Sequence, residues 1–173
     1  MSKMSLKKIN SFKKDRIGIS ALTSYDASFA KLADNCGIDI ILVGDSLGEV
    51  IQGHANTHSV TMKHMCYHTE IVSRAIKKAF LIVDMPKDSY KTKSQALKNA
   101  KKLVGINMAD MVKVECNKKY IGIIQHLISN SIPVCSHIGI LPQTIINKKD
   151  YKKIGKNINE ENKLIDEAIL IEK

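Results

Sequence analysis

The sequence has no tryptophan and few other aromatic residues, and its positive charge comes almost entirely from lysine. Aromatic residues make up 5% of the 173 residues, and the 27 basic side chains include only two arginines, Arg16 and Arg74. Proteins that read nucleic-acid bases usually present arginine forks and aromatic platforms. The net charge of +10 therefore favours a solvated basic surface, with a basic nucleic-acid-binding protein as the weaker alternative.

Long apolar runs and closely paired cysteines are also lacking. No run approaches the roughly 18 apolar residues of a membrane span, and the basic residues 1–16 lack the apolar centre of a secretory signal. The cysteines form no CxxC pair and lie far apart, at Cys36, Cys66, Cys116 and Cys135. We expect a cytoplasmic protein with a single domain over residues 1–173.

Short apolar runs alternate with helical patterns along the chain. The runs predict strands at 17–23, 38–43, 80–83, 109–115 and 132–137, and the helical patterns lie at 27–35, 61–77, 92–104, 120–129 and 164–173. Residues 47–59 and 148–162 are expected to be irregular. Such alternation is typical of parallel strands joined by crossover helices, either in an open doubly wound sheet or in a (β/α)₈ barrel. No GxGxxG follows the first strand, so a dinucleotide-binding fold has no positive sign.

Two carboxylates stand where predicted strands end. Asp45 follows the strand at 38–43, and Asp84 follows the strand at 80–83. Ligands of α/β folds bind at this edge of the sheet, and a pair of carboxylates suits Mg²⁺. The alternative is that each aspartate caps the turn or helix that follows it.

Lys113 and Glu115 lie two residues apart on one predicted strand, so their side chains point to the same face. They could bind a metal or an anionic substrate, or form an internal ion pair that fills a barrel. The histidine pairs His54/His58 and His64/His68 are interpreted as surface or capping residues. His137 at a strand end is open between a substrate contact and a core histidine.

Five ordered segments carry a resemblance. They are ALTSYDASFAKLAD, ILVGDSLGEVIQGH, D-M-P, MVKVE and PVCSHIGILPQ. In this order and spacing they resemble the ketopantoate hydroxymethyltransferase family, from about Leu6 to Lys173. The chain departs from the family pattern at PKDSY after the third strand, at ILPQ and at KKDYKKIG.

The resemblance implies a (β/α)₈ TIM-barrel type, Mg²⁺-dependent and usually decameric. Its reaction moves a hydroxymethyl group from 5,10-methylenetetrahydrofolate to 3-methyl-2-oxobutanoate and gives 2-dehydropantoate in pantothenate biosynthesis. By motif, Asp45 and Asp84 would hold Mg²⁺, and Glu115 would complete the metal's surroundings. The substrate would contact Asp45, Ser46 (mainly through its backbone N–H), Asp84 and Lys113.

A full barrel of this type takes about 250 residues. The 173 residues would supply about five βα units, an apparently truncated barrel. The resemblance also implies a general base, a glutamate at the end of the sixth strand, beyond Lys173, so we expect little or no turnover from residues 1–173 alone. The alternative is a catalytically inactive fragment, or a subunit that acts only through a partner chain.

Overall fold

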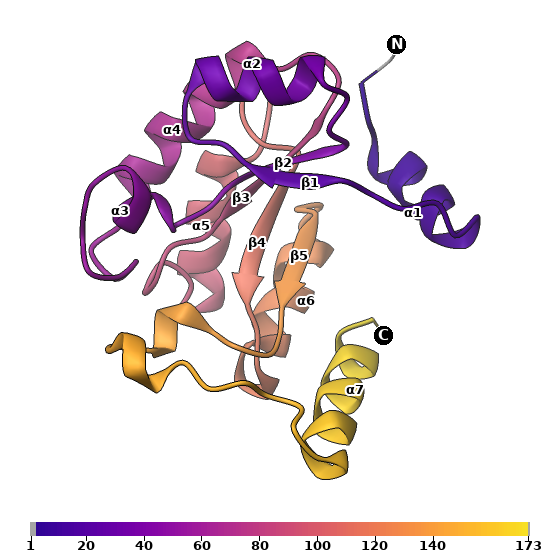
Figure 1. The fold of residues 1–173 in the computed structure, drawn as a ribbon, viewed down its shortest axis with the longest axis vertical. Helices are drawn as coiled ribbons and strands as arrows, with labels where there is room; N and C mark the ends of the chain where they lie inside the picture. Colours follow the sequence, from indigo (N-terminus) through magenta and orange to yellow (C-terminus); the bar gives the residue numbers. More distant parts are fainter. Residues whose placement is uncertain (1–2, 173) are drawn as a thin grey trace.

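A single parallel sheet organises the chain. The computed structural model describes residues 3–172, apart from the side chain of Lys148. The sheet has five strands in the order β1-β2-β3-β4-β5 (Figure 1). Their bounds are β1 Ala21–Thr23, β2 Ile40–Val43, β3 Phe80–Asp84, β4 Met111–Glu115 and β5 Val134–His137. A doubly wound sheet reverses its strand order at one point, whereas this order follows the chain without a reversal, as in a barrel.

Helices connect the strands where the sequence predicts them. They are α2 Ala27–Asn35, α4 Met62–Ala75, α5 Lys93–Leu103 and α6 Ile121–Ser129. Side-chain caps begin two of these helices: the Asp26 side chain accepts from the backbone N–H groups of Ser28 and Phe29, and the Thr92 side chain accepts from that of Gln95.

The structure differs from the prediction in the first strand, since residues 17–20 lie outside β1, and in three helices. A helix not foreseen, α1 Leu6–Lys14, precedes the sheet, and the connection after β2 contains a short helix, α3 Leu47–Val50. The last helix, α7 Ile158–Glu172, begins six residues earlier than the apolar pattern suggested. The Asn157 side chain accepts from the backbone N–H of Glu160, and this polar cap starts the helix ahead of the apolar pattern at 164–173. None of the described helices is long and apolar enough to cross a membrane.

The outer face of the sheet packs against the crossover helices. Alternate strand residues such as Ile41, Val83 and Val112 join one buried cluster with residues of α2, α4, α5 and α6. Figure 1 shows these helices gathered on one side of the sheet. Because successive side chains of a strand point to opposite faces, the residues between these positions point to the inner face.

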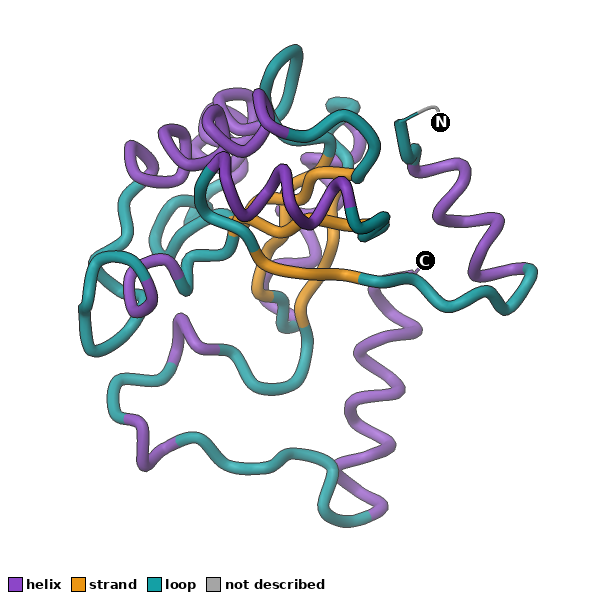
Figure 2. Tube along the Cα trace, turned by 45° about the horizontal axis from the view of Figure 1, so that its top comes forward, coloured by secondary structure: helices purple, strands orange, loops and turns teal. Residues whose placement is uncertain are grey.

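The inner face has a smaller core of its own near the start of the strands. Phe80, Ile82 and Met111 form it with Met4, and Ile9 and Phe12 of α1 pack against it. Figure 2 shows α1 across the strands from the crossover helices, and its Lys13 forms an ion pair with Glu172 of α7 at 2.9 Å. The N-terminal part of the inner face is therefore covered, and the polar inner side chains lie toward the strands' carboxyl ends.

A buried carboxylate secures the turn before β3. Asp34 of α2, 3% exposed, accepts from the backbone N–H groups of Lys77, Lys78 and Ala79 at 3.0, 2.9 and 2.7 Å. Burial alone would raise the pKa of Asp34, but these three hydrogen bonds outweigh it and lower the pKa. The folded chain therefore binds the Asp34 proton less tightly than the unfolded chain does.

We expect Asp34→Ala to lower the free energy of unfolding at pH 7 by about 2–3 kcal/mol, because three N–H donors lose a charged acceptor. The folded pKa of Asp34 lies below the unfolded value of about 3.9, so the ionised carboxylate contributes its full stabilisation at neutral pH. It disappears as the pH falls through the folded pKa. Urea unfolding at pH 7 and pH 3 measures it, with the exposed Asp166→Ala as the control. An equal loss at both pH values would contradict the assignment.

Candidate active site

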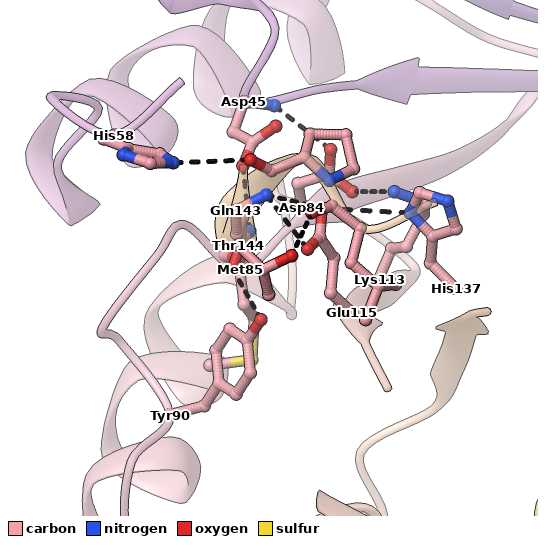
Figure 3. Close-up of polar contacts among 12 residues, drawn as sticks. Asp45, His58, Asp84, Met85, Tyr90, Lys113, Glu115, His137, Gln143 and Thr144 are labelled. Carbon is pink, nitrogen blue, oxygen red and sulfur yellow. Dashed lines mark hydrogen bonds and ion pairs between the residues drawn. The ribbon is translucent and has the colours of Figure 1, made fainter. Parts of the chain in front are cut away.

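Polar side chains from four strands meet at the carboxyl edge of the sheet. Asp45 follows β2, Asp84 ends β3, Lys113 and Glu115 lie on β4, and His137 ends β5. The register aligns Asp84 with Lys113, and Glu115 with His137. The structure thus brings together every charged residue that the sequence suggested for the site (Figure 3).

The two aspartates are buried side by side. Each is 6% exposed, and the Asp84 Oδ2 atom accepts a hydrogen bond from the backbone N–H of Asp45 at 3.1 Å. Gly44 permits this approach, because a Cβ atom there would lie 2.7 Å from Ser46 Oγ and 3.4 Å from Asp84 Oδ2. Neither aspartate caps a helix among the described residues, since α3 has Ser46 as its N-cap without a side-chain hydrogen bond.

Lys113 neutralises part of this charge. Its Nζ atom donates to Asp84 Oδ1 at 2.8 Å, and the side chains of Lys113 and Asp84 are 21% and 9% exposed. Val112 and Val114 on either side are fully buried toward the helices. Lys113 and Glu115 therefore share the inner face, as their two-residue spacing predicts, although the ion-pair partner of Lys113 is Asp84 rather than Glu115.

Burial and charge shift the pKa values of this cluster. Burial, and then the charge of Asp84, raise the pKa of Asp45 to about 6. Burial raises the pKa of Glu115 to about 7. For Lys113, burial acts to lower the pKa, but the charge and hydrogen bond of Asp84 outweigh it and raise the pKa. The site therefore holds more negative charge than its one lysine can balance.

Gln143 joins the cluster from the segment after β5. It lies in a 3₁₀ turn, Pro142–Thr144, and its side-chain Nε2 donates to Asp45 Oδ2 at 2.8 Å. Its backbone N–H faces both carboxylate oxygens of Glu115, at 3.2 and 3.0 Å. Tyr90, from the loop after β3, donates to Gln143 Oε1 at 2.6 Å.

Sequence reasoning did not single out Gln143 or Tyr90 as site residues. Gln143 lies 98 positions after Asp45, so no short spacing pattern connects them. The only available signal was the ILPQ segment, which the resemblance included as a motif. A glutamine after a proline gives no chemical sign that it points inward.

Ser46 and the histidines take different places around the cluster. The Ser46 hydroxyl shares a hydrogen bond of 2.8 Å with Tyr25 Oη. His64 caps α4 with Thr61, as interpreted from the sequence, and His68 Nδ1 lies 2.7 Å from the Tyr25 carbonyl oxygen. His137 Nδ1 lies 3.9 Å from Glu115 Oε1, too far for a hydrogen bond, and burial lowers its pKa.

Cation binding needs a donor set that matches the ion. Within residues 3–172, no group of three or more histidine, cysteine, aspartate or glutamate side chains is arranged to enclose a metal. Mg²⁺ needs less, because it keeps several waters and takes one or two carboxylates together with substrate oxygens. Adjacent buried aspartates with only one lysine partner fit that requirement.

A model of the family described as ketopantoate hydroxymethyltransferase matches residues 3–173. The chain belongs to this family. The 3-methyl-2-oxobutanoate hydroxymethyltransferase of Ruthia magnifica subsp. Calyptogena magnifica is 45% identical over 168 residues, which are 97% of this chain and 64% of that protein. The protein of the same name from Buchnera aphidicola subsp. Acyrthosiphon pisum (strain 5A) is 42% identical over 172 residues, 99% of this chain and 65% of that protein.

Ketopantoate hydroxymethyltransferase relatives are longer than the chain, which spans less than two thirds of their length. Solved structures confirm the fold. A 2,3-dimethylmalate lyase of the PEP mutase/isocitrate lyase superfamily matches with a TM-score of 0.62 at 15% identity, over 79% of this chain and 52% of that one. An oxaloacetate acetylhydrolase matches with a TM-score of 0.59 at 12% identity, over 77% and 52%. The predicted TIM-barrel type is therefore correct, and residues 3–172 form five of its strands.

Proposed function

We propose that this chain carries the keto-acid site of a hydroxymethyltransferase that acts on 3-methyl-2-oxobutanoate and produces 2-dehydropantoate. Family membership supports the reaction. The observation that carries the proposal is the buried Asp45–Asp84 pair with Lys113 at the carboxyl edge of the sheet. Such a site can orient a small anion that carries a carboxylate and a ketone oxygen.

Each polar residue would have a distinct task. Asp45 and Asp84 would hold Mg²⁺. Glu115 would complete the surroundings of the ion by accepting hydrogen bonds from water. When bound, Mg²⁺ acts as a Lewis acid that polarises the ketone and makes the neighbouring C–H bond more acidic. Asp45, Ser46, Asp84 and Lys113 would contact the substrate, and Lys113 would supply fixed positive charge where negative charge develops on the ketone oxygen.

We assign no proton acceptor among residues 1–173. The buried carboxylates already have other partners, since Asp84 accepts from Lys113 and Asp45, and Glu115 accepts from Gln143. The base that removes the substrate proton would come from outside these residues.

Family membership alone supports the remaining parts of the proposal. These are 5,10-methylenetetrahydrofolate as the one-carbon donor, a cytoplasmic location and assembly into a homo-oligomer. They would be tested on a chain with the full length of the relatives, by donor-dependent formation of 2-dehydropantoate and by light scattering.

Binding of the keto acid tests the proposed site directly. We expect 3-methyl-2-oxobutanoate to bind residues 1–173 at least about 10-fold more tightly with Mg²⁺ than without it, because the cation adds an electrostatic contact to the ketone oxygen. Isothermal titration calorimetry measures both affinities. The matched control ligand is 3-methylbutanoate, which keeps the carboxylate and the branched chain but lacks the ketone oxygen. Equal Mg²⁺ dependence for the two ligands, or none for either, would reject the proposed site.

A further inference from the structure

One residue makes more contacts with the carboxylate cluster than any function assigned above requires. Gln143 is 7% exposed and is hydrogen bonded to three residues and one backbone carbonyl of the site (Figure 3). These partners come from the ends of β2, β3 and β4 and from the loop after β3. A buried amide whose two N–H donors and oxygen all have partners is held in one orientation.

The contacts divide into two groups with different consequences. The Nε2 group donates to Asp45 Oδ2 at 2.8 Å and to the Met85 carbonyl oxygen at 2.9 Å, so it ties the Asp45 carboxylate to the end of β3. The backbone N–H of Gln143 faces both oxygens of Glu115. Side chain and backbone thus orient two different carboxylates from a single residue.

Tyr90 sets the direction of the amide. Its hydroxyl donates to Gln143 Oε1 at 2.6 Å, so Oε1 must face Tyr90 and Nε2 must face Asp45. Tyr90 is 4% exposed and packs edge-on against Tyr120, with ring centroids 5.2 Å apart. Burial raises the pKa of Tyr90 further above its ordinary value, so the hydroxyl remains a donor.

The turn that carries Gln143 is itself fixed. The backbone N–H of Thr144 donates to the Leu141 carbonyl oxygen at 2.9 Å, and that of Ile145 donates to Pro142 at 3.1 Å. His58 Nε2 lies 3.3 Å from the Pro142 carbonyl oxygen. The turn therefore presents Gln143 to the cluster as part of a rigid segment.

We propose that Gln143 is a positioning residue that fixes the Asp45 and Glu115 carboxylates for cation binding, with Tyr90 setting its orientation. The inference rests on the proposed function, because it assumes that the cluster binds Mg²⁺. Outer-shell partners that orient metal ligands typically change metal affinity 10–100-fold when they are replaced.

Calorimetric titration of residues 1–173 with MgCl₂ tests the proposal. Gln143→Met keeps a similar side-chain length but removes the amide, and we expect it to raise the dissociation constant about 10–100-fold. Tyr90→Phe removes one hydrogen bond, and we expect a rise of about 5-fold. Thr144→Ala is the matched control, because Thr144 lies in the same turn and its hydroxyl donates only to the Leu141 carbonyl oxygen. Its affinity should equal that of the unmodified chain.

The outcomes separate this proposal from the proposed function. Thermal unfolding of each variant without Mg²⁺ shows which variants are folded. If folded Gln143→Met binds Mg²⁺ as tightly as the unmodified chain, the positioning role is wrong and the metal site stands. Tighter binding would mean that Gln143 competes with the cation, which also overturns the proposal.

A variant that fails to fold does not leave the question open. If Gln143→Met is unfolded, Tyr90→Phe decides, because unchanged affinity in that variant contradicts the orienting role and weaker affinity supports it. If the unmodified chain binds no Mg²⁺, the metal site of the proposed function fails and the positioning role fails with it.

Discussion

Lys113→Met is expected to lower the free energy of unfolding by about 3 kcal/mol at neutral pH. Lys113 donates to Asp84 Oδ1 at 2.8 Å, and the Asp84 side chain is 9% exposed. Methionine fills a similar volume but leaves Asp84 and its neighbour Asp45 without a cation. Removing one partner of a buried ion pair costs about 3–5 kcal/mol, and the partial exposure of Lys113 places this case at the lower end. Urea unfolding without Mg²⁺ measures the loss.

Two further variants isolate the cause. In Lys113→Met combined with Asp84→Asn, both charges of the pair are gone, so we expect the double variant to be more stable than Lys113→Met alone. Lys101→Met, at an exposed position of α5, should leave the stability within about 0.5 kcal/mol. If Lys101→Met and Lys113→Met cost the same, the ion pair contributes nothing specific to the folded state.

Asp45→Asn is expected to change stability and cation affinity in opposite directions. At pH 8, where Asp45 is ionised, its charge is buried beside that of Asp84. Asparagine removes this repulsion and can still accept from Gln143 Nε2, so the free energy of unfolding without Mg²⁺ should rise by about 1–2 kcal/mol. The same change removes a charged ligand from the proposed metal site. The Mg²⁺ dissociation constant should therefore rise at least about 100-fold, more than outer-shell substitutions cause.

A variant whose structure is merely damaged would lose both stability and Mg²⁺ affinity. Higher stability together with weaker Mg²⁺ binding therefore points to the removed charge itself. Asp166→Asn on the exposed face of α7 is the control with the same chemical change. It should alter neither quantity. Unchanged Mg²⁺ affinity in Asp45→Asn would show that the cation, if bound at all, is held elsewhere.

The sequence predicted the fold well where local signals agree with tertiary structure. The helical pattern at 27–35 is α2, and the apolar run before Asp84 is a fully buried strand. Because parallel strands end at one edge, the position of Asp45 and Asp84 after such runs was enough to place them together. The shared face of Lys113 and Glu115 followed from the two-residue period of a strand, and the burial of Val112 and Val114 in the structure shows that this face is the inner one.

Other features depend on contacts between distant parts of the chain. The lysine-rich sequence of α1 does not by itself indicate where the helix packs. Its apolar side lies against Met111 and Phe80 of the sheet. The partner of Lys113 was uncertain because two carboxylates lie within reach, and only the alignment of Asp84 with Lys113 decides between them. Gln143 reaches the site through a turn whose direction no periodicity reveals.

The placement of α1 restricts how molecules reach Lys113. Met4, Ile9 and Phe12 lie against the inner residues Phe80 and Ile82 at the start of the strands. This apolar cluster covers the start of the strands, but β1 and β5 have no further strand beside them among residues 3–172, so the inner face around Lys113 stays open along those edges as well as at the strands' carboxyl ends.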